Sequence, residues 1–257
     1  MPQGDQQQQA QLDSPMKVLS PCKLCGQPAL LVKSHIIPES FYEIPRQGDG
    51  TLKLLADNPG DFAKRVPTGI WSRIVCSKCE DSFARYDDYA ARLLMGDTKA
   101  SQRPTLPNGL RAEIYDDFNY DLLQLFFLSL VWRAAASDHV VFKGISLGPR
   151  EEQIKAALRG SDPDLARDIA IVLYSTSIFA GTLSPHMERL DGGLRGVRIY
   201  LHRYTAIIKT DKRSFLPPSS EFHISRERPL CVVPRGLVGS GELPLMKAIV
   251  KANPSAF

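Results

Sequence analysis

The chain has 257 residues, of which 43% are hydrophobic and 23% are charged, an ordinary balance for a globular protein. Its formal net charge of +4 is compatible with a phosphate-bearing partner but is far too small to require one. No apolar run approaches the roughly 18 residues of a membrane-spanning helix, and the polar first twenty residues lack the pattern of a signal peptide. Composition therefore argues against a membrane protein, and we expect a cytoplasmic location.

The N-terminal part of the chain is predicted to contain a tail and a small module. Residues 1–18 are polar and offer almost nothing to bury, so we expect a disordered tail. Residues 19–95 form a module that is bounded by two cysteine pairs. Within it, residues 29–37 and 51–55 have the composition of short strands. After Cys79, apolar residues recur at three- and four-residue steps, which predicts a helix that leaves the second cysteine pair.

A larger second domain, residues 110–257, is predicted to follow the polar, proline-broken linker 96–109. Residues 116–138 become apolar on nearly every face, which is typical of a helix buried inside a domain. Arg133 lies near the end of this segment, and we expect it to pair with an acid or to contact a phosphate. An amphipathic helix is predicted within residues 148–160, opened by a proline and glutamates and ended by a glycine.

The last third of the chain mixes both kinds of element. A third helix is expected to begin near Asp162 and Pro163, since proline suits the first turn of a helix. Residues 196–210 partly alternate between apolar and polar, which predicts a strand or a pair of strands. A short helix is expected over residues 244–251. The fold class that these elements predict is α+β.

Four of the five cysteines form two C-x2-C pairs, and these are Cys22, Cys25, Cys76 and Cys79. Zinc prefers four soft ligands at tetrahedral corners, and a two-residue gap lets one tight turn offer two thiolates to one ion. The pairs therefore predict one structural zinc, with reduced cysteines or a redox pair as the alternative. A site completed by His35 would leave a second pair idle. Cys231 is expected to be a buried thiol.

The segment Ser34-His35-Ile36-Ile37-Pro38 follows the first pair, and the second pair opens a helix. Over about residues 20–90 this arrangement resembles the zinc-supported HNH endonucleases of the His-Me finger class. The resemblance implies a ββα module in which His35 activates water, and a divalent cation, Mg²⁺ or Mn²⁺, that stabilises the leaving oxygen of a DNA phosphodiester. Together with the segment SLVWRAAAS, the module also resembles an uncharacterised bacterial family, and a mobile-element or phage-defence setting is expected.

Parts of the family pattern are altered in this chain. Ser34 stands where the family commonly has a metal-binding Asp or His, and Glu80 stands where it has His or Asn. Glu80 and Asp87 lie seven residues apart, on roughly one face of the predicted helix, and their carboxylates suit Mg²⁺ or Mn²⁺. Alternatively, these acids form a solvated helix face, and His35 is a histidine hydrogen-bonded to a backbone carbonyl.

Basic residues of the module are candidates for contacts with nucleic-acid phosphates, namely Lys33, Arg73 and Lys78. By analogy with other two-part nucleases, residues 110–257 are expected to select the target or to bind a protein partner. The leading hypothesis is a metal-dependent DNA endonuclease. The alternative is a non-catalytic, zinc-stabilised protein that binds nucleic acid or protein through a degenerate HNH site.

Overall fold

The structure is a computed structural model that describes residues 18–42, 69–96, 98–106, 109–176, 183–236 and 242–252, with the backbone of 53–54 and 64–65. Its N-terminal elements are β1 (Ser20–Pro21), β2 (Pro28–Ala29), β3 (Leu31–His35), β4 (Lys53–Leu54), β5 (Lys64–Arg65), β6 (Trp71–Cys76) and α1 (Ser77–Leu94). The predicted tail, apart from residue 18, lies outside the described residues.

The second half supplies the remaining helices and strands. They are β7 (Glu113–Tyr115), α2 (Tyr120–Ala136), α3 (Arg150–Gly160), β8 (Ile171–Ser175), β9 (His186–Leu190), β10 (Leu194–Leu201), β11 (Tyr204–Lys209), α4 (Ser219–Phe222), β12 (Leu230–Pro234) and α5 (Glu242–Ala252). The mixture of helices and strands confirms the α+β class. Among the described residues, no helix is long and apolar enough to cross a lipid bilayer.

β3 and β6 form a two-stranded antiparallel ribbon, and α1 begins directly after β6. The predicted strand at 29–37 is confirmed as β3, and the predicted strand at 51–55 supplies β4, which pairs with β5. The partner of β3 is β6, which the sequence analysis missed. A register shift in the ribbon explains this, because Ile74 and Val75 are adjacent and both are fully buried. A shift of this kind breaks the two-residue alternation that marks a strand.

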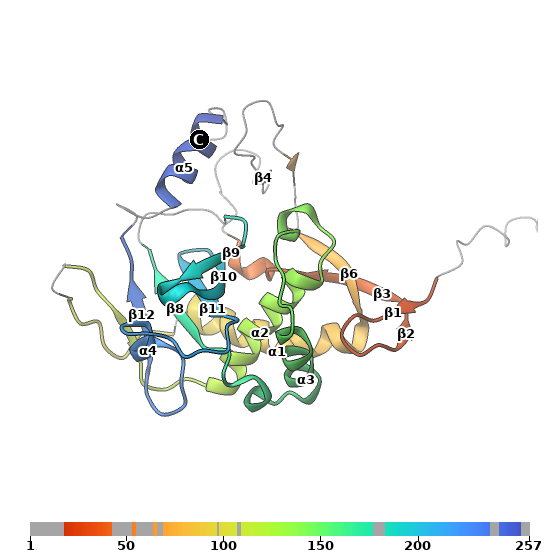
Figure 1. Cartoon of the computed structure of the whole chain (residues 1–257), viewed down its shortest axis with the longest axis horizontal. Coiled ribbons are helices and arrows are strands. Elements are labelled where there is room, and N and C mark those ends of the chain that lie inside the picture. Colours follow the sequence, from red (N-terminus) through yellow and green to blue (C-terminus); the bar gives the residue numbers. More distant parts are fainter. Residues whose placement is uncertain are drawn as a thin grey trace, which may run out of the picture.

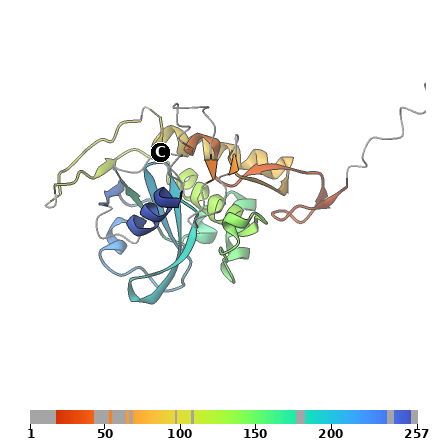
Figure 2. The ribbon, with the colours of Figure 1, turned by 90° about the horizontal axis from the view of Figure 1, so that it is seen from above.

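α2 is the central helix of the molecule, and the prediction of a buried helix is confirmed. All residues from Leu123 to Ala134 are buried, because α2 packs against α1 on one side and contacts α3 and the sheet on others. Figures 1 and 2 both show α2 between the β3–β6 ribbon and the large sheet. The Asn119 side chain caps its first turn by accepting from the Leu122 amide at 2.9 Å.

The large sheet has six strands in the order β7-β12-β8-β11-β10-β9, and only the β12–β8 pair is parallel. β10 and β11 form a hairpin, which confirms a pair of strands within residues 196–210. The amphipathic helix and the C-terminal helix are confirmed as α3 and α5. The helix expected near Asp162 is wrong, since only one 3-10 turn forms at Pro163–Ala166. The chain has to turn there because Ile171 already begins β8.

One buried cluster connects the two halves of the chain. It contains Phe83 and Tyr86 from α1 together with Phe126 and Trp132 from α2, and it continues onto the inner face of the sheet. Residues 98–106, in the predicted linker, make isolated bridges with residues that precede and enter β7. The shared core fixes the positions of α1 and the β3–β6 ribbon relative to α2. The candidate site is formed by residues of these three elements.

Candidate functional site

The four paired cysteines meet at the end of the ribbon where β6 runs into α1. Their Sγ atoms all lie within 4.8 Å of one another, and those of Cys25 and Cys76 are 4.0 Å apart. The first turn closes because the Gly26 amide donates to the Cys22 carbonyl at 2.8 Å, with Gly26 at a φ of +77°. A residue with a side chain is strained at that φ, so glycine suits the position.

The sulfur spacing matches a metal site better than a disulfide. Tetrahedral zinc with Zn–S distances of about 2.3 Å would place its sulfurs about 3.8 Å apart, whereas a disulfide bond is about 2.05 Å long. Burial raises the pKa of the Cys22 thiol, but backbone amides, including that of Cys76 at 3.3 Å, outweigh it and lower the pKa to about 7. Burial raises the pKa of Cys79. The cluster can hold a metal ion such as zinc.

A buried ion pair joins α1 to α2 at the His35 end of the ribbon. The fully buried Arg133 guanidinium donates to both carboxylate oxygens of Asp87, at 2.7 and 2.9 Å. It also donates to the His35 carbonyl at 2.8 Å and to the Ser129 hydroxyl at 3.0 Å. The expected pairing of Arg133 with an acid is confirmed. Arg133 therefore ties the end of β3 to both helices, and both Asp87 oxygens already accept hydrogen bonds.

Ser34 and Glu80 come together between β3 and the first turn of α1. Ser34 is completely buried, and its Oγ and Glu80 Oε2 are buried atoms with no hydrogen-bond partner in the described part of the chain. Burial raises the pKa of the Glu80 carboxyl, while the adjacent Ser34 hydroxyl, Arg133 and His35 lower it. His35 is half-buried at the end of β3 and also acts electrostatically on Asp87. The structure thus gathers Ser34, His35, Glu80 and Asp87.

The three predicted phosphate-binding residues are all exposed. The Lys33 ammonium lies 4.5 Å from the centre of the Trp71 ring, and the Arg73 guanidinium lies 5.9 Å from it. Lys78 stands in the first turn of α1. Trp71 is the strand residue opposite His35 in the ribbon register.

Two members of the site were not singled out from the sequence. Trp71 belongs to the overlooked strand β6, and recognising that strand would have placed it beside His35. Ser129 carries no local signal, since its hydroxyl matters only because the Arg133 side chain, one turn later, folds back onto it. Comparison of the chain with protein-family models, with curated proteins and with solved structures gave no match. Function therefore has to be argued from the site itself.

Proposed function

We propose that this protein is a metal-dependent endonuclease of the HNH type that hydrolyses phosphodiester bonds in DNA, with a structural zinc in its cysteine cluster. The observation that carries the proposal is the grouping of Ser34, His35 and Glu80 where β3 meets α1. The chain order of strand, strand and helix supports it, and so does the thiol cluster that joins the same elements. A zinc ion on the four thiolates would fix α1 against the ribbon.

His35 is assigned as the general base. Water adds to phosphorus, the bond from phosphorus to the leaving oxygen breaks, and the His35 imidazole accepts the proton of the attacking water. Arg133 supports this role because it holds the His35 backbone carbonyl at 2.8 Å and thereby limits movement of the end of β3. In this assignment Arg133 positions the base and does not touch the substrate.

Ser34 and Glu80 are assigned to a catalytic divalent cation. Mg²⁺ and Mn²⁺ prefer oxygen ligands, and the buried Ser34 and Glu80 oxygens lie next to each other beside His35, with no partner outside this pair among the described residues. When bound, the cation would stabilise negative charge on the leaving oxygen. Asp87 is less suited to this role than the sequence suggested, because Arg133 occupies both of its oxygens.

A second candidate function is favoured by that same ion pair. If Asp87 serves only to hold Arg133, and Ser34 replaces a stronger ligand, the module is a zinc-stabilised binding unit without catalysis. Lys33 and Arg73 beside Trp71 would then contact nucleic acid with no cleavage following.

Cleavage by the His35→Ala variant tests the assignment of the base. Loss of a general base typically slows a reaction by about 100-fold to 10,000-fold, so His35→Ala is expected to reduce plasmid nicking in Mg²⁺ or Mn²⁺ by at least about 100-fold. Zinc content should remain one ion per chain. His186→Ala, which removes an exposed histidine of β9, is the matched control and should cleave normally.

Two results would contradict the nuclease. Equal cleavage by His35→Ala and wild type would remove His35 from the reaction. A wild-type protein with one zinc per chain, bound to DNA but unable to cut it in either cation, would leave the non-catalytic binding unit as the better description.

A further inference from the structure

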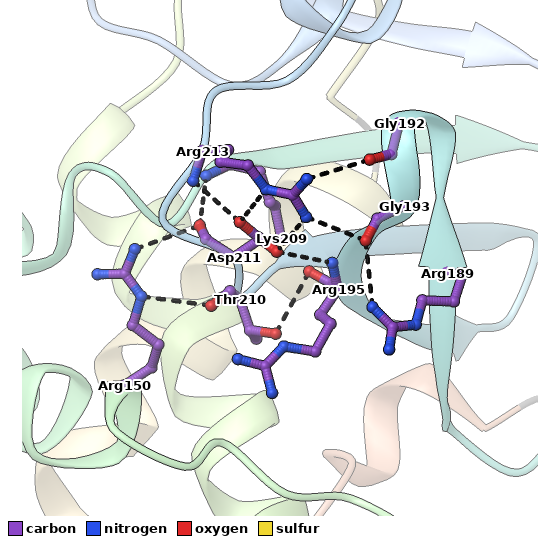
Figure 3. A network of polar contacts seen from close by, with 9 residues as sticks. All are labelled: Arg150, Arg189, Gly192, Gly193, Arg195, Lys209, Thr210, Asp211 and Arg213. Carbon is purple, nitrogen blue, oxygen red and sulfur yellow. Dashed lines mark hydrogen bonds and ion pairs between the residues drawn. The ribbon is translucent and has the colours of Figure 1, made fainter.

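The turn between β9 and β10 is held in place by an arginine from a neighbouring segment. Arg213 donates to the carbonyls of Gly192 and Gly193 at 3.2 and 3.0 Å, and its guanidinium pairs with Asp211 at 2.9 Å (Figure 3). Gly192 has a φ of +70°, and a Cβ there would lie 2.7 Å from Leu216 Cδ1. The turn between β9 and β10 therefore has one defined conformation.

Two buried cationic side chains lie near this turn, and both donate hydrogen bonds to nearby backbone carbonyls. Lys209 is only 2% exposed, and its ammonium donates to the carbonyls of Asp168 and Asp211 at 3.0 and 2.8 Å. Arg150 pairs with the Asp168 carboxylate at 2.7 Å. It also donates to the Thr210 carbonyl at 3.3 Å, as Figure 3 shows. Asp168 thus pairs with Arg150, and Asp211 pairs with Arg213 and accepts from the Arg195 amide at 3.3 Å, so both carboxylates already have partners.

The exposed side of the hairpin carries two arginines at directly opposite positions of its strands. Arg189 on β9 and Arg195 on β10 are direct partners in the antiparallel register, which puts both side chains on one face of the sheet. Arg189 donates to the Gly193 carbonyl at 3.2 Å. Within the described residues neither arginine has a carboxylate partner. Like charges at directly opposite positions destabilise a sheet.

The local charge is high for this chain. Residues 189–195 and 209–213 contain five cations and two carboxylates, an excess of three, whereas the whole chain has a formal net charge of +4. Two guanidinium groups without a carboxylate partner among the described residues are suited to phosphate, which accepts two parallel N–H bonds from each fork. The unfavourable pair becomes favourable once an anion lies between its members.

We propose that the face formed by Arg189 and Arg195 binds the phosphodiester backbone of a nucleic acid, and so gives the C-terminal sheet a direct part in holding the substrate. The inference rests on the proposed function for the choice of nucleic acid over other polyanions. Asp191, Gly192 and Gly193 carry no apolar side chain, and the half-exposed Leu216 beside Gly192 is a single apolar group, so a lipid surface fits less well.

Binding of a labelled 20-base-pair duplex by full-length protein tests the inference separately from cleavage. Binding is measured in the His35→Ala background by fluorescence anisotropy between 50 and 200 mM KCl, and cleavage is compared separately in proteins that retain His35. Each lost phosphate contact lowers affinity at 0.1 M salt by about eight-fold and the salt slope by about 0.9. Arg189→Gln with Arg195→Gln is therefore expected to raise Kd at least about ten-fold and to flatten the slope by about two.

The control makes the same charge change at the opposite edge of the sheet. Arg103→Gln with Arg111→Gln alters two exposed arginines next to the edge strand β7, and its Kd should stay within about two-fold. The double variant Arg189→Gln with Arg195→Gln is called the hairpin variant. Because it removes the like-charge pair, its Tm without nucleic acid should be about 1–3 °C higher than that of the parent protein. Weaker binding together with higher stability is a result that a merely structural pair would not give.

Three results would overturn the inference. The first is an equal loss of duplex affinity in the hairpin variant and in the control variant. The second is a Tm of the hairpin variant below that of the parent protein. The third is arginine-dependent binding to vesicles of 30% phosphatidylserine without binding to the duplex. If wild type binds the duplex through this face but never cleaves DNA, the inference stands and the nuclease assignment fails. If it cleaves and the hairpin variant binds and cleaves equally well, the inference fails alone.

Discussion

Cys76→Ser is expected to remove the bound metal and to lower the Tm by at least about 10 °C. Cys76 ends β6 and immediately precedes α1, and its Sγ lies 4.0 Å from that of Cys25, so one substitution disturbs both turns of the cluster. The zinc affinity of isolated fingers corresponds to about 10–16 kcal/mol, which rivals the entire stability of a typical domain. Metal content by mass spectrometry and thermal unfolding by circular dichroism measure the two effects.

Cys231→Ser is the matched control for that variant. Cys231 is a partly buried thiol of β12 that lies outside the four-cysteine cluster, so its zinc content should equal that of wild type. Retention of one zinc by Cys76→Ser would contradict the four-thiolate site. So would a loss of stability no greater than that of Cys231→Ser. Wild-type protein purified without metal and with reversibly oxidised cysteines would favour the redox alternative.

Arg133→Ala is expected to destabilise the protein by about 3–5 kcal/mol, because it leaves the Asp87 carboxylate inside the protein without its charge partner. The guanidinium is completely buried, and the variant also strips the His35 carbonyl and the Ser129 hydroxyl of their donor. Denaturant unfolding of Arg133→Ala measures the loss. Glu152→Ala breaks an exposed pair with Lys155 and should change stability by less than about 1 kcal/mol.

The pH dependence of this loss has a definite sign. Burial raises the pKa of the Asp87 carboxyl in the folded protein, and Arg133 opposes that rise, so removing Arg133 raises the pKa further. A folded-state pKa above the unfolded one means that stability is lost as pH rises through the folded value. The deficit of Arg133→Ala should therefore be smaller at pH 5 than at pH 7. A deficit that does not change with pH, or one below about 1 kcal/mol, would contradict a buried ion pair.

A double-mutant cycle separates the pair from its surroundings. Replacing both partners, Arg133→Met with Asp87→Leu, removes both buried charges, so the double variant should be more stable than either single variant. Cleavage assays on the double variant also test the two assignments of Asp87. Retained cleavage would show that Asp87 is not a catalytic ligand. If stability is restored but cleavage is lost, Asp87 or Arg133 has a role in catalysis.

Local sequence patterns were sufficient for several elements. The C-x2-C spacing predicted which four thiols belong together, because each two-residue gap determines its own turn. The three- and four-residue apolar steps after Cys79 predicted α1, and the apolar composition of residues 116–138 predicted the buried helix α2. In each case the information lies within about one or two turns of chain, where backbone geometry alone relates spacing to position.

Only the tertiary structure decided how these elements meet. The pairing of β3 with β6 includes a register shift, and that shift hides the strand pattern of β6 in the sequence. The contact between Arg133 and Asp87 joins residues 46 positions apart. Arg189 and Arg195 lie opposite each other only because of the register of the hairpin. Such contacts follow from which surfaces pack together, and packing leaves no periodic mark on the local sequence.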